Sequence, residues 1–528
     1  MMKDKIKTLI EESIRVLQKE KKLKEFEIPE VLVEKPSDDK NGDYSTNIAL
    51  KITKLADKKP FELSKIIKGK FQTISYGLEK VETVEPGFIN FYLSKNYLEE
   101  RLDLILKQKN KFGDLKIGNK EKVNVEFISA NPTGPLTLGN GRGGFCGDVL
   151  SNVLKKAGYK VTKEYYINNI GEQIRKLGHS VIGDNEAVYK GKYIDDLAKK
   201  IKGKNPDKVG EKAAKIILAK MIKPVVKKMG IKFDKWFSEK DLYKTKETDK
   251  VLKELFKKNF TYRKDGALWF ESMQFGDDKD RVLVRENGEN TYFVSDIAYL
   301  KNKFRRGFKK LVFFLGADHY GYVRRLKAAA RALGYDSENV NIIIMQLVRL
   351  FEKGKEVRMS KREGVYVTIN ELIDEVGIDV ARFFFLLRNA DSHFNFDMDL
   401  AKEKSEKNPV YYVQYAYVRC NSILRKSRGK NQKMKIQKLN HPSELNLIKQ
   451  LIRFPEVIGD TAKDYQVQRI PQYTIDLADS FHRFYENCRV IGEEDKELSE
   501  ARLFLIKAVK IVFENSFNLM GISSPKKM

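Results

Sequence analysis

Residues 131–143, NPTGPLTLGNGRG, are the stretch of the sequence best suited to chemistry, with two prolines and four glycines. They follow a β-rich run at 122–129 and precede a run with helical spacing, which predicts a turn from a strand into a helix. Such a turn lets backbone N–H groups approach a phosphate, and the helix N-terminus adds favourable dipole charge. The spacing matches neither G-x-x-x-x-G-K-S/T nor G-x-G-x-x-G, which argues against a P-loop NTPase and a dinucleotide-dependent oxidoreductase.

A second candidate segment is EVRMSKREG at 356–364, which follows the last strand expected in this part of the chain. Its basic side chains, Arg358 and Lys361 among them, flank Met359 and Ser360. A loop with such groups can stabilise the charge that builds on a leaving pyrophosphate. Basic loops are common by themselves, so this segment is informative because it follows the glycine-rich loop.

The elements around these two segments predict a parallel sheet. Strand candidates at 122–129, 160–167, 311–316 and 340–348 alternate with helical spacing, as in the helix candidate at 322–335. A strand, a glycine-rich turn, a helix and a second strand form a βαβ unit, with which a doubly wound sheet begins. The fold class of this part of the chain is therefore α/β.

The chain of 528 residues is too long for one hydrophobic core, since domains usually hold about 100–200 residues. We expect a small α+β domain over residues 1–110. A nucleotide-binding domain over 111–365 follows, with an insertion at about 185–290. A connecting segment, 366–400, precedes the region 401–528, where strand signals fade and helical patterns dominate.

The net charge is +28, and 33% of the residues are charged. Such a surplus favours a polyanionic partner through counterion release, but a lysine-rich surface with no nucleic-acid role fits equally well. Three widely separated cysteines, Cys146, Cys420 and Cys488, argue against a disulfide framework and suit a reducing cytoplasm. No run reaches the ~20 apolar residues of a membrane span, so no membrane partner is expected.

The two loops together resemble the HIGH and KMSKS signatures of class I aminoacyl-tRNA synthetases. The wider resemblance is to arginyl-tRNA synthetases of the bacterial kind; it runs from end to end and is weakest over about 185–270. Besides EFISANPTGPLTLGNGRG, the similar blocks are EYYINNIGEQI (164–174), TYFVSDIAY (291–299), LGADHYGYVRRLKAA (315–329), VARFFFLLRNADSHFNFD (380–397) and NPVYYVQYAYVR (408–419).

This resemblance implies a class I synthetase architecture. A Rossmann-like catalytic domain would lie between an N-terminal α+β domain that contacts tRNA and a C-terminal all-α anticodon-binding domain. The activity implied is ligation of L-arginine to tRNA(Arg) through an arginyl-adenylate, with release of AMP and pyrophosphate. ATP would bring Mg²⁺ held mostly by phosphates and water, without a tightly bound protein metal. The family is commonly monomeric, and it needs bound tRNA before it activates arginine.

The resemblance places Thr137 and Asn140 where the HIGH signature has its two histidines. Those histidines donate hydrogen bonds to the phosphates of ATP, and a hydroxyl and an amide are also donors. Arginyl enzymes usually keep both histidines, but active tryptophanyl-tRNA synthetases carry a Thr-x-Gly-Asn form. The catalytic residues implied are Thr137, Asn140, Arg358 and Lys361, and the ATP contacts implied are Pro135, Gly139, Gly141, Asp318, Met359 and Ser360.

By the same resemblance, Glu126 and Asp296 bind the guanidinium group of arginine, and Tyr292 lies beside them. Carboxylates suit this group because it is planar, always charged and carries five donors. Structural interpretations compete: Glu126 could pair with a structural arginine, Asp296 could cap a helix, and His319 could lie in the core. The remaining arginine contacts implied are Asn131, His319 and Gln173.

The tyrosines of the run YYVQYAYVR (411–419) have two interpretations as well. In an anticodon-binding domain they would stack on splayed bases, as aromatic side chains do in many RNA complexes. At helical spacing they could equally pack in the core of that domain. The residues concerned are Tyr411, Tyr412, Tyr415 and Tyr417.

Three other functions compete with arginine ligation: a synthetase for a different amino acid, a smaller nucleotidyltransferase and a non-catalytic tRNA-binding paralogue. The acidic pocket residues argue against the first, and the long terminal regions argue against the second. The absence of both histidines motivates the third. The retained Lys361 argues against it, because a protein that only binds tRNA needs no such residue.

Overall fold

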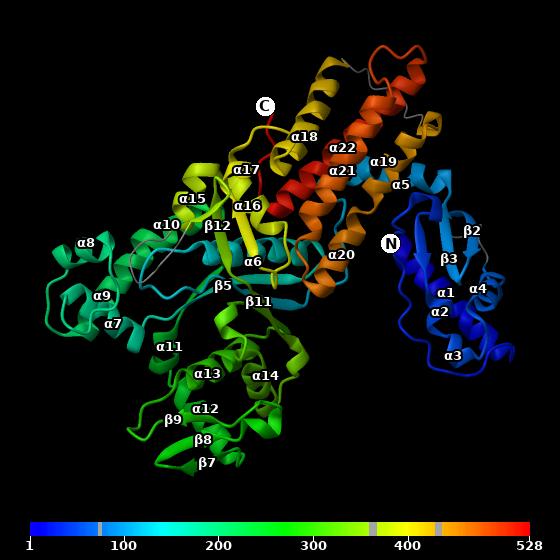
Figure 1. Ribbon diagram of the computed structural model, residues 1–528. Coiled ribbons are helices and arrows are strands. Elements are labelled where there is room, and N and C mark those ends of the chain that lie inside the picture. The colour runs from blue at the N-terminus through cyan, green and yellow to red at the C-terminus, as the bar shows by residue number, and fades with distance from the viewer. Residues whose placement is uncertain (72–76, 358–366, 428–435) are drawn as a thin grey trace.

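The computed structural model describes residues 1–71, 77–357, 367–427 and 436–528 (Figure 1). Its centre is a five-stranded sheet with the order β11-β10-β4-β5-β6, in which every neighbouring pair is parallel. Helix α6 (Leu138–Lys156) is the crossover from β4 to β5, as the glycine-rich turn predicts. The α/β fold class is confirmed. The strands are β4 (Lys122–Glu126), β5 (Lys160–Ile167), β6 (Lys235–Ser238), β10 (Lys310–Gly316) and β11 (Val340–Met345).

Two features differ from the expectation. The span 185–290, expected as an insertion, contains β6, which pairs with β5 at the edge of the sheet. This strand has four residues in a lysine-rich stretch, so periodicity does not reveal it. The expected strand 340–348 is interrupted at Gln346, whose N–H donates a hydrogen bond to the carbonyl of Ala390 at 2.9 Å. A second sheet follows, made of β12 (Val348–Glu352), β13 (Lys355–Val357) and β14 (Phe394–Asp397).

A second hydrophobic core lies between β10 and the elements that follow β6. It is built around Phe270, Leu283, Val294 and Leu311, and an antiparallel sheet with the order β7-β8-β9 lies against it. The elements of the middle region are α7 (Glu172–Ile182), α8 (Lys192–Lys200), α9 (Pro206–Ile217), α10 (Lys223–Lys228), α11 (Glu239–Lys244), α12 (Glu247–Lys257), β7 (Thr261–Lys264), β8 (Ala267–Phe270), β9 (Arg281–Val284), α13 (Tyr292–Arg305), α14 (Tyr322–Ala332), α15 (Ile369–Val376), α16 (Ile378–Leu386) and α17 (Met398–Lys402).

The N-terminal part of the chain lies against the C-terminal helices (Figure 1). Lys3 pairs with Asp460 at 2.9 Å, and the hydroxyl of Tyr44 donates to Glu456 at 3.0 Å. The N-terminal elements are α1 (Met2–Lys19), β1 (Tyr44–Thr46), α2 (Ile48–Lys51), α3 (Thr53–Ala56), α4 (Pro60–Lys68), β2 (Leu78–Val84), β3 (Phe88–Leu93) and α5 (Lys95–Gln108). The C-terminal helices are α18 (Pro409–Lys426), α19 (Pro442–Ile452), α20 (Phe454–Asp464), α21 (Arg469–Asn487) and α22 (Lys496–Met520).

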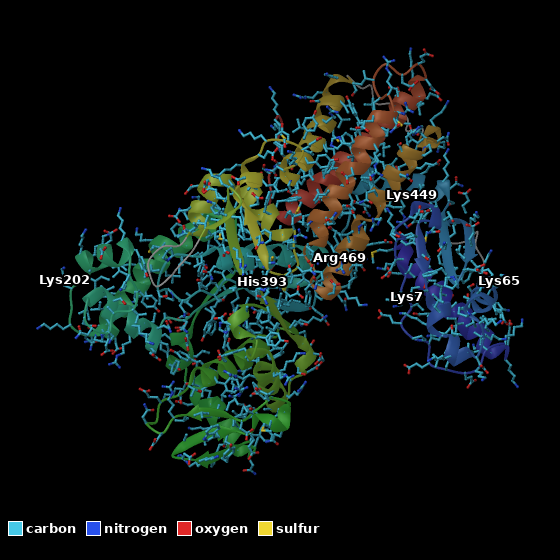
Figure 2. All side chains as sticks on the ribbon, in the orientation of Figure 1. Lys7, Lys65, Lys202, His393, Lys449 and Arg469 are labelled. Atoms are coloured by element: carbon cyan, nitrogen blue, oxygen red, sulfur yellow. The ribbon has the colours of Figure 1, made fainter. Side chains whose placement is uncertain are left out.

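The basic charge is spread over the molecule. Lys7 and Lys65 lie on the N-terminal part, Lys449 lies on α19, and Lys202 lies at the opposite end (Figure 2). Among the residues that the structure describes, no helix has the length and apolar character to cross a bilayer.

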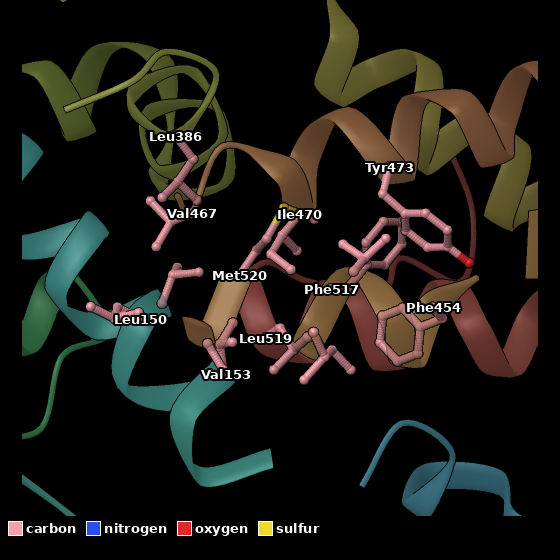
Figure 3. Packing of buried hydrophobic residues seen from close by; sticks show 14 of the residues in the cluster. Leu150, Val153, Leu386, Phe454, Val467, Ile470, Tyr473, Phe517, Leu519 and Met520 are labelled. Carbon is pink, nitrogen blue, oxygen red and sulfur yellow. The ribbon is translucent and has the colours of Figure 1, made fainter. Parts of the chain in front are cut away.

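Helix α6 is almost wholly buried, and its glycines let it approach the sheet closely. A Cβ at Gly147 would lie 2.3 Å from Cγ of Phe127, well below contact distance. On another side, Leu150 and Val153 lie in one apolar cluster with Leu519 and Met520 of α22 (Figure 3). The helix that begins at the glycine-rich loop is therefore packed against both the sheet and the C-terminal helices.

Gly147→Ala is expected to lower the free energy of unfolding by about 1–3 kcal/mol, because overpacking forces Phe127 or α6 to move. The matched control is Gly143→Ala on the same helix, where a Cβ meets nothing closer than Cγ of Met345 at 3.9 Å. Better helix propensity should leave this control neutral or up to ~1 kcal/mol more stable. Urea unfolding compares the two variants, and equal stabilities would contradict the close approach.

Candidate active site

Two adjoining cavities lie at the carboxyl edge of the central sheet, where β4 and β10 end. Their volumes are about 780 Å³ and 340 Å³. Both are lined by Asn140, Gly316 and Asp318, so one extended ligand could occupy the two together. Open parallel sheets generally bind their ligands at this edge.

The larger cavity brings together all of the residues that the sequence predicts as arginine contacts. They come from four separate parts of the chain: the end of β4, the glycine-rich loop, the start of α7, and the region from α13 to α14. Their side chains could not be placed together by local sequence alone. They are Glu126, Asn131, Gln173, Tyr292, Asp296 and His319.

Several of these side chains lie near the mouth of the cavity. Asn131 is exposed, Tyr292 is 39% exposed, and the side chain of His319 is 46% exposed. The interpretation of His319 as a core histidine is therefore wrong. The oxygen of the Gln173 amide accepts a hydrogen bond from the hydroxyl of Tyr189 at 2.5 Å. A ligand in the cavity would thus meet a polar rim.

The Glu126 carboxylate is already paired. Its Oε2 lies 2.5 Å from Nζ of Lys303, which is fully buried on α13, and its Oε1 accepts from the hydroxyl of Ser129 at 3.1 Å. Burial lowers the pKa of Lys303, while the adjacent carboxylate opposes that shift. Glu126 thus has a buried cationic partner, but this partner is a lysine and not the arginine that the structural interpretation named. The pair leaves the negative charge of Glu126 largely balanced.

Asp296 forms no ion pair with a basic side chain among the described residues, although the charge of Arg325 acts on it from a greater distance. Its Oδ2 accepts from the hydroxyl of Tyr322 at 2.6 Å. Burial raises the pKa of Asp296 to about 6, and the nearby Glu126 adds to the shift. The alternative role as a helix cap is wrong, because α13 begins at Tyr292, four residues earlier. Asp296 therefore carries its charge at neutral pH and loses it in mild acid.

Sequence reasoning missed Glu239, a third acid that lines the same cavity. Burial raises its pKa to about 7, against hydrogen bonds from Ser295 and Tyr166. Glu239 directly follows β6, so a correct prediction of that strand would have placed it at the carboxyl edge. Lys303 and Tyr322 were missed for a different reason, since no local signal identifies their partners.

Thr137 and Asn140 bond to each other at the start of α6. The Thr137 hydroxyl donates to Oδ1 of Asn140 at 2.9 Å, and the Thr137 N–H donates to the same oxygen at 3.0 Å. The N–H of Asn140 donates in return to the Thr137 hydroxyl oxygen at 3.4 Å, and these reciprocal bonds form a capping box. The capping box uses the hydroxyl proton of Thr137, whereas no described residue accepts a hydrogen bond from Nδ2 of Asn140, a residue that lines both cavities. Asn140 is therefore the better placed of the two donors.

The other predicted ATP contacts are placed unequally. Pro135 lines the larger cavity, Gly139 the smaller, and Asp318 both. Gly141 lines neither: its N–H donates to the Thr137 carbonyl at 3.0 Å, and its Cα faces Ile369. The four residues predicted from the basic segment lie outside the described residues: Arg358, Met359, Ser360 and Lys361.

The residues that follow the basic segment contact the glycine-rich loop. Val367 lines the smaller cavity, and Thr368 forms an antiparallel bridge with Thr137. The N–H of Ile369 donates to the carbonyl of Leu136 at 3.1 Å. The C-terminal flank of the second candidate segment therefore adjoins the first. Within the described ranges, no three His, Cys, Asp or Glu side chains gather as metal ligands.

Asp296→Asn is expected to stabilise the protein at pH 7 by up to about 3 kcal/mol. The wild-type carboxyl titrates near 3.8 when unfolded and near 6 when folded, so its charge destabilises the fold above pH 6. The gain falls between pH 6 and pH 4, where the folded carboxyl becomes protonated, and at pH 4 it should be below about 1 kcal/mol. Urea unfolding of both proteins at pH 7 and pH 4 checks this, and an equal gain at both values would contradict it.

Comparison with known protein families gives three matches along the chain. An arginyl-tRNA synthetase N-terminal domain model matches residues 4–93. The class I (R) catalytic domain model of tRNA synthetases matches residues 101–181 and 183–397. A DALR anticodon-binding domain model matches residues 413–528. The three matches follow one another in the order that the N-terminal part, the central sheet and the C-terminal helices have in the fold.

Individual relatives agree with these matches. The chain is 42% identical to an arginine–tRNA ligase from Shouchella clausii, over 96% of this chain and 95% of that one. It is 43% identical to an arginine–tRNA ligase from Carboxydothermus hydrogenoformans, over 94% of each. Thermus thermophilus arginyl-tRNA synthetase has the same fold, with a TM-score of 0.80 over the full length of both chains at 20% identity. The chain therefore belongs to the arginyl-tRNA synthetase family of class I.

Proposed function

We propose that the protein ligates L-arginine to tRNA(Arg) with ATP, and that AMP and pyrophosphate are released. The observation that carries this proposal is the larger cavity, where all six predicted arginine contacts meet beside the start of α6. Membership of the family adds support. A protein that only binds tRNA would need no cavity lined by three carboxylates next to a helix N-terminus.

The guanidinium group of arginine would enter between Asp296 and Glu126. Since Lys303 largely balances Glu126, the charge that attracts the cation comes mainly from Asp296, with a part from Glu239. Glu126 keeps free lone pairs, so it can still accept N–H bonds that fix the planar group. Tyr292 would cover the side chain at the mouth. The ammonium and carboxylate end would be held by Asn131, His319 and Gln173.

The phosphates of ATP would lie at the start of α6, beside Pro135 and Gly139. There the Asn140 amide donates and the helix dipole is favourable. Thr137 would act through Asn140, because its hydroxyl keeps the amide oxygen turned toward the cap and the amide nitrogen turned toward the cavities. Asp318 would reach the ribose. The basic segment would act on the leaving pyrophosphate through Arg358 and Lys361, with Met359 and Ser360 as further contacts.

The reaction would have two steps, and neither needs a covalent enzyme intermediate. A carboxylate oxygen of arginine attacks the α-phosphorus of ATP, and the bond to pyrophosphate breaks. The 2′-hydroxyl of the terminal adenosine of tRNA then attacks the activated carbonyl, and AMP leaves. Mg²⁺ would enter with ATP, held by phosphates and water. The protein contributes position and charge stabilisation.

The other regions would bind tRNA. We assign residues 1–110 to the tRNA elbow, 111–365 to catalysis, 366–400 to a connection and 401–528 to the anticodon. The domain matches and the contact between the N-terminal part and the C-terminal helices support this division. With three buried, unpaired cysteines among the described residues, we further propose a cytoplasmic protein that acts as a monomer.

Aromatic side chains on α18 and α21 form a surface suited to anticodon bases. Tyr411 and Tyr415 are parallel with ring centroids 6.3 Å apart. The guanidinium of Arg419 lies 4.9 Å from the centre of the Tyr415 ring and 4.5 Å from that of Tyr485. Tyr417, by contrast, is buried in the core, as the competing interpretation of this run predicts. The exposed rings offer faces on which splayed bases can stack.

Asn140→Ala is expected to lower arginine-dependent ATP–pyrophosphate exchange about 10²–10³-fold, the usual cost of losing one transition-state donor. Thr137→Ser keeps the capping hydroxyl and serves as the matched control, with a change below about threefold. Filter binding should show unaltered affinity of both variants for tRNA. A similar small effect of both substitutions on exchange would contradict the assignment of Asn140.

Tyr415→Ala is expected to raise the KM for tRNA roughly 5–100-fold, because one base loses its stacking partner. The KM for ATP should not change, since α18 lies far from the cavities. Tyr417→Phe is the control: it keeps the buried ring and removes only the hydroxyl that bonds Glu514. Steady-state charging assays measure both, and an unchanged KM for tRNA in Tyr415→Ala would refute this surface.

Charging of tRNA(Arg) with labelled amino acids tests the proposed function itself. Arginine should be attached, and citrulline, its neutral isostere, should be attached about 10⁴-fold less efficiently, because the Asp296 carboxylate would face a neutral group in place of a cation. Equal use of both amino acids would show that the cavity does not select a cation. Charging with another amino acid alone would overturn the proposal.

A further inference from the structure

Four polar side chains join helix α6 to the end of helix α22, and we call them the α6–α22 junction. They are Asp148 and Asn152 of α6, Lys163 of β5 and Arg382 of α16. Nζ of Lys163 lies 2.5 Å from Oδ1 of Asp148 and 2.9 Å from Oδ1 of Asn152. Nη2 of Arg382 donates to the other Asp148 oxygen. Only Asn152 is partly exposed, so two cations and one anion are held away from solvent.

Backbone carbonyls at helix ends supply the remaining acceptors. Arg382 donates to the carbonyls of Met520 at 2.7 Å and Met229 at 2.6 Å, and Nδ2 of Asn152 donates to that of Leu519 at 3.0 Å. Leu519 and Met520 end α22, and Met229 follows α10, so the cation faces the negative ends of two helix dipoles. The junction thus caps α22 with side chains from other elements.

The close approach of α22 to the junction constrains the next residue. Gly521 has φ +68°, and a Cβ there would lie 2.5 Å from Nη2 of Arg382. Losing one partner of a buried ionic group is strongly unfavourable, because the remaining charges stay desolvated. Buried polar groups of this kind favour one register over others. The end of α22 therefore has a single well-defined position relative to α6.

Helix α6 connects this junction to the candidate active site. Asn140 lies in its first turn, and Asn152 lies twelve residues later, about 18 Å along the axis. At the other end, α22 belongs to the region proposed to bind the anticodon. Because the end of α22 is clamped to α6, a displacement of one helix must move the other or break buried charge contacts.

We propose that Asp148 and Asn152 are positioning residues. Through them, the position of the end of α22 determines the position of α6, and therefore that of the Asn140 amide. The proposal rests on the proposed function and adds a physical link between anticodon binding and the phosphate donor. Through this link, tRNA binding at the C-terminal helices would be coupled to the activity of the candidate active site.

Asn152→Ala tests the link, because it removes the bond to Leu519, and with it the bond from Lys163, at a partly exposed position. We expect kcat for charging to fall roughly three- to tenfold, the value of one lost hydrogen bond, with KM for tRNA and ATP within about twofold. Replacing the anticodon of the tRNA should then lower kcat less than it does in the wild type. Asn152→Asp keeps the acceptor for Lys163 but removes the donor to Leu519, and should lose as much kcat.

The matched control is Asn515→Ala, which removes another amide that ties α22 to the protein. Nδ2 of Asn515 donates to the carbonyls of Lys109 at 3.0 Å and Phe112 at 3.3 Å, away from α6. It should lower Tm as much as Asn152→Ala does and leave kcat unchanged. Equal kcat for Asn152→Ala and Asn515→Ala, or rescue by Asn152→Asp, would overturn the link while the wild type still charges tRNA. An inactive wild type would overturn the proposed function together with the link.

Discussion

A buried guanidinium holds the first turn of helix α6 against the rest of the catalytic region. Arg142 is fully buried and donates to three backbone carbonyls, at distances of 2.6–3.0 Å, from the segments that follow β11 and α16. Moving α6 would leave that cation without acceptors in a desolvated place, which is strongly unfavourable. The amide of Asn140 is therefore positioned by the buried contacts of α6, to which the α6–α22 junction also belongs, and not by the loop that precedes the helix. The carbonyls belong to Gln346, Asn389 and Ser392.

The cost of burying charge also determines the electrostatics of the cavity beside α6. Three carboxylates line it, but Lys303 balances one of them and burial keeps the other two near their titration points, with pKa values of about 6 and 7. An arriving cation would bind and draw both toward their charged forms. The two hydrogen-bond donors proposed for the phosphates of ATP have no such pH dependence. Asn140 and Thr137 stay neutral at every physiological pH, whereas histidines would titrate.

Much of the fold follows from local pattern, because alternating strands and helices leave few arrangements other than a parallel sheet. The six residues proposed as arginine contacts were predicted by resemblance, and the cavity that they line together depends on the order of the strands in the sheet. The partner of Glu126 was not predictable, since Lys303 is far away in sequence and carries no local signal. The capping role of Thr137 was not predicted, because the spacing to Asn140 is that of a capping box but the usual Glu or Gln is absent. Strand β6 was missed because four residues are too few for periodicity, and Glu239 was missed with it.

Arginine-dependent ATP–pyrophosphate exchange by the wild-type protein, with and without tRNA(Arg), tests the central claim most directly. It reports the first chemical step alone, at the cavities where α6 begins. The account predicts exchange that requires both arginine and tRNA, from a working site in which an asparagine amide donates a hydrogen bond to the phosphates of ATP. No exchange with any amino acid, together with tight tRNA binding, would contradict the account, because the chain would then be a binding protein with an inactive site.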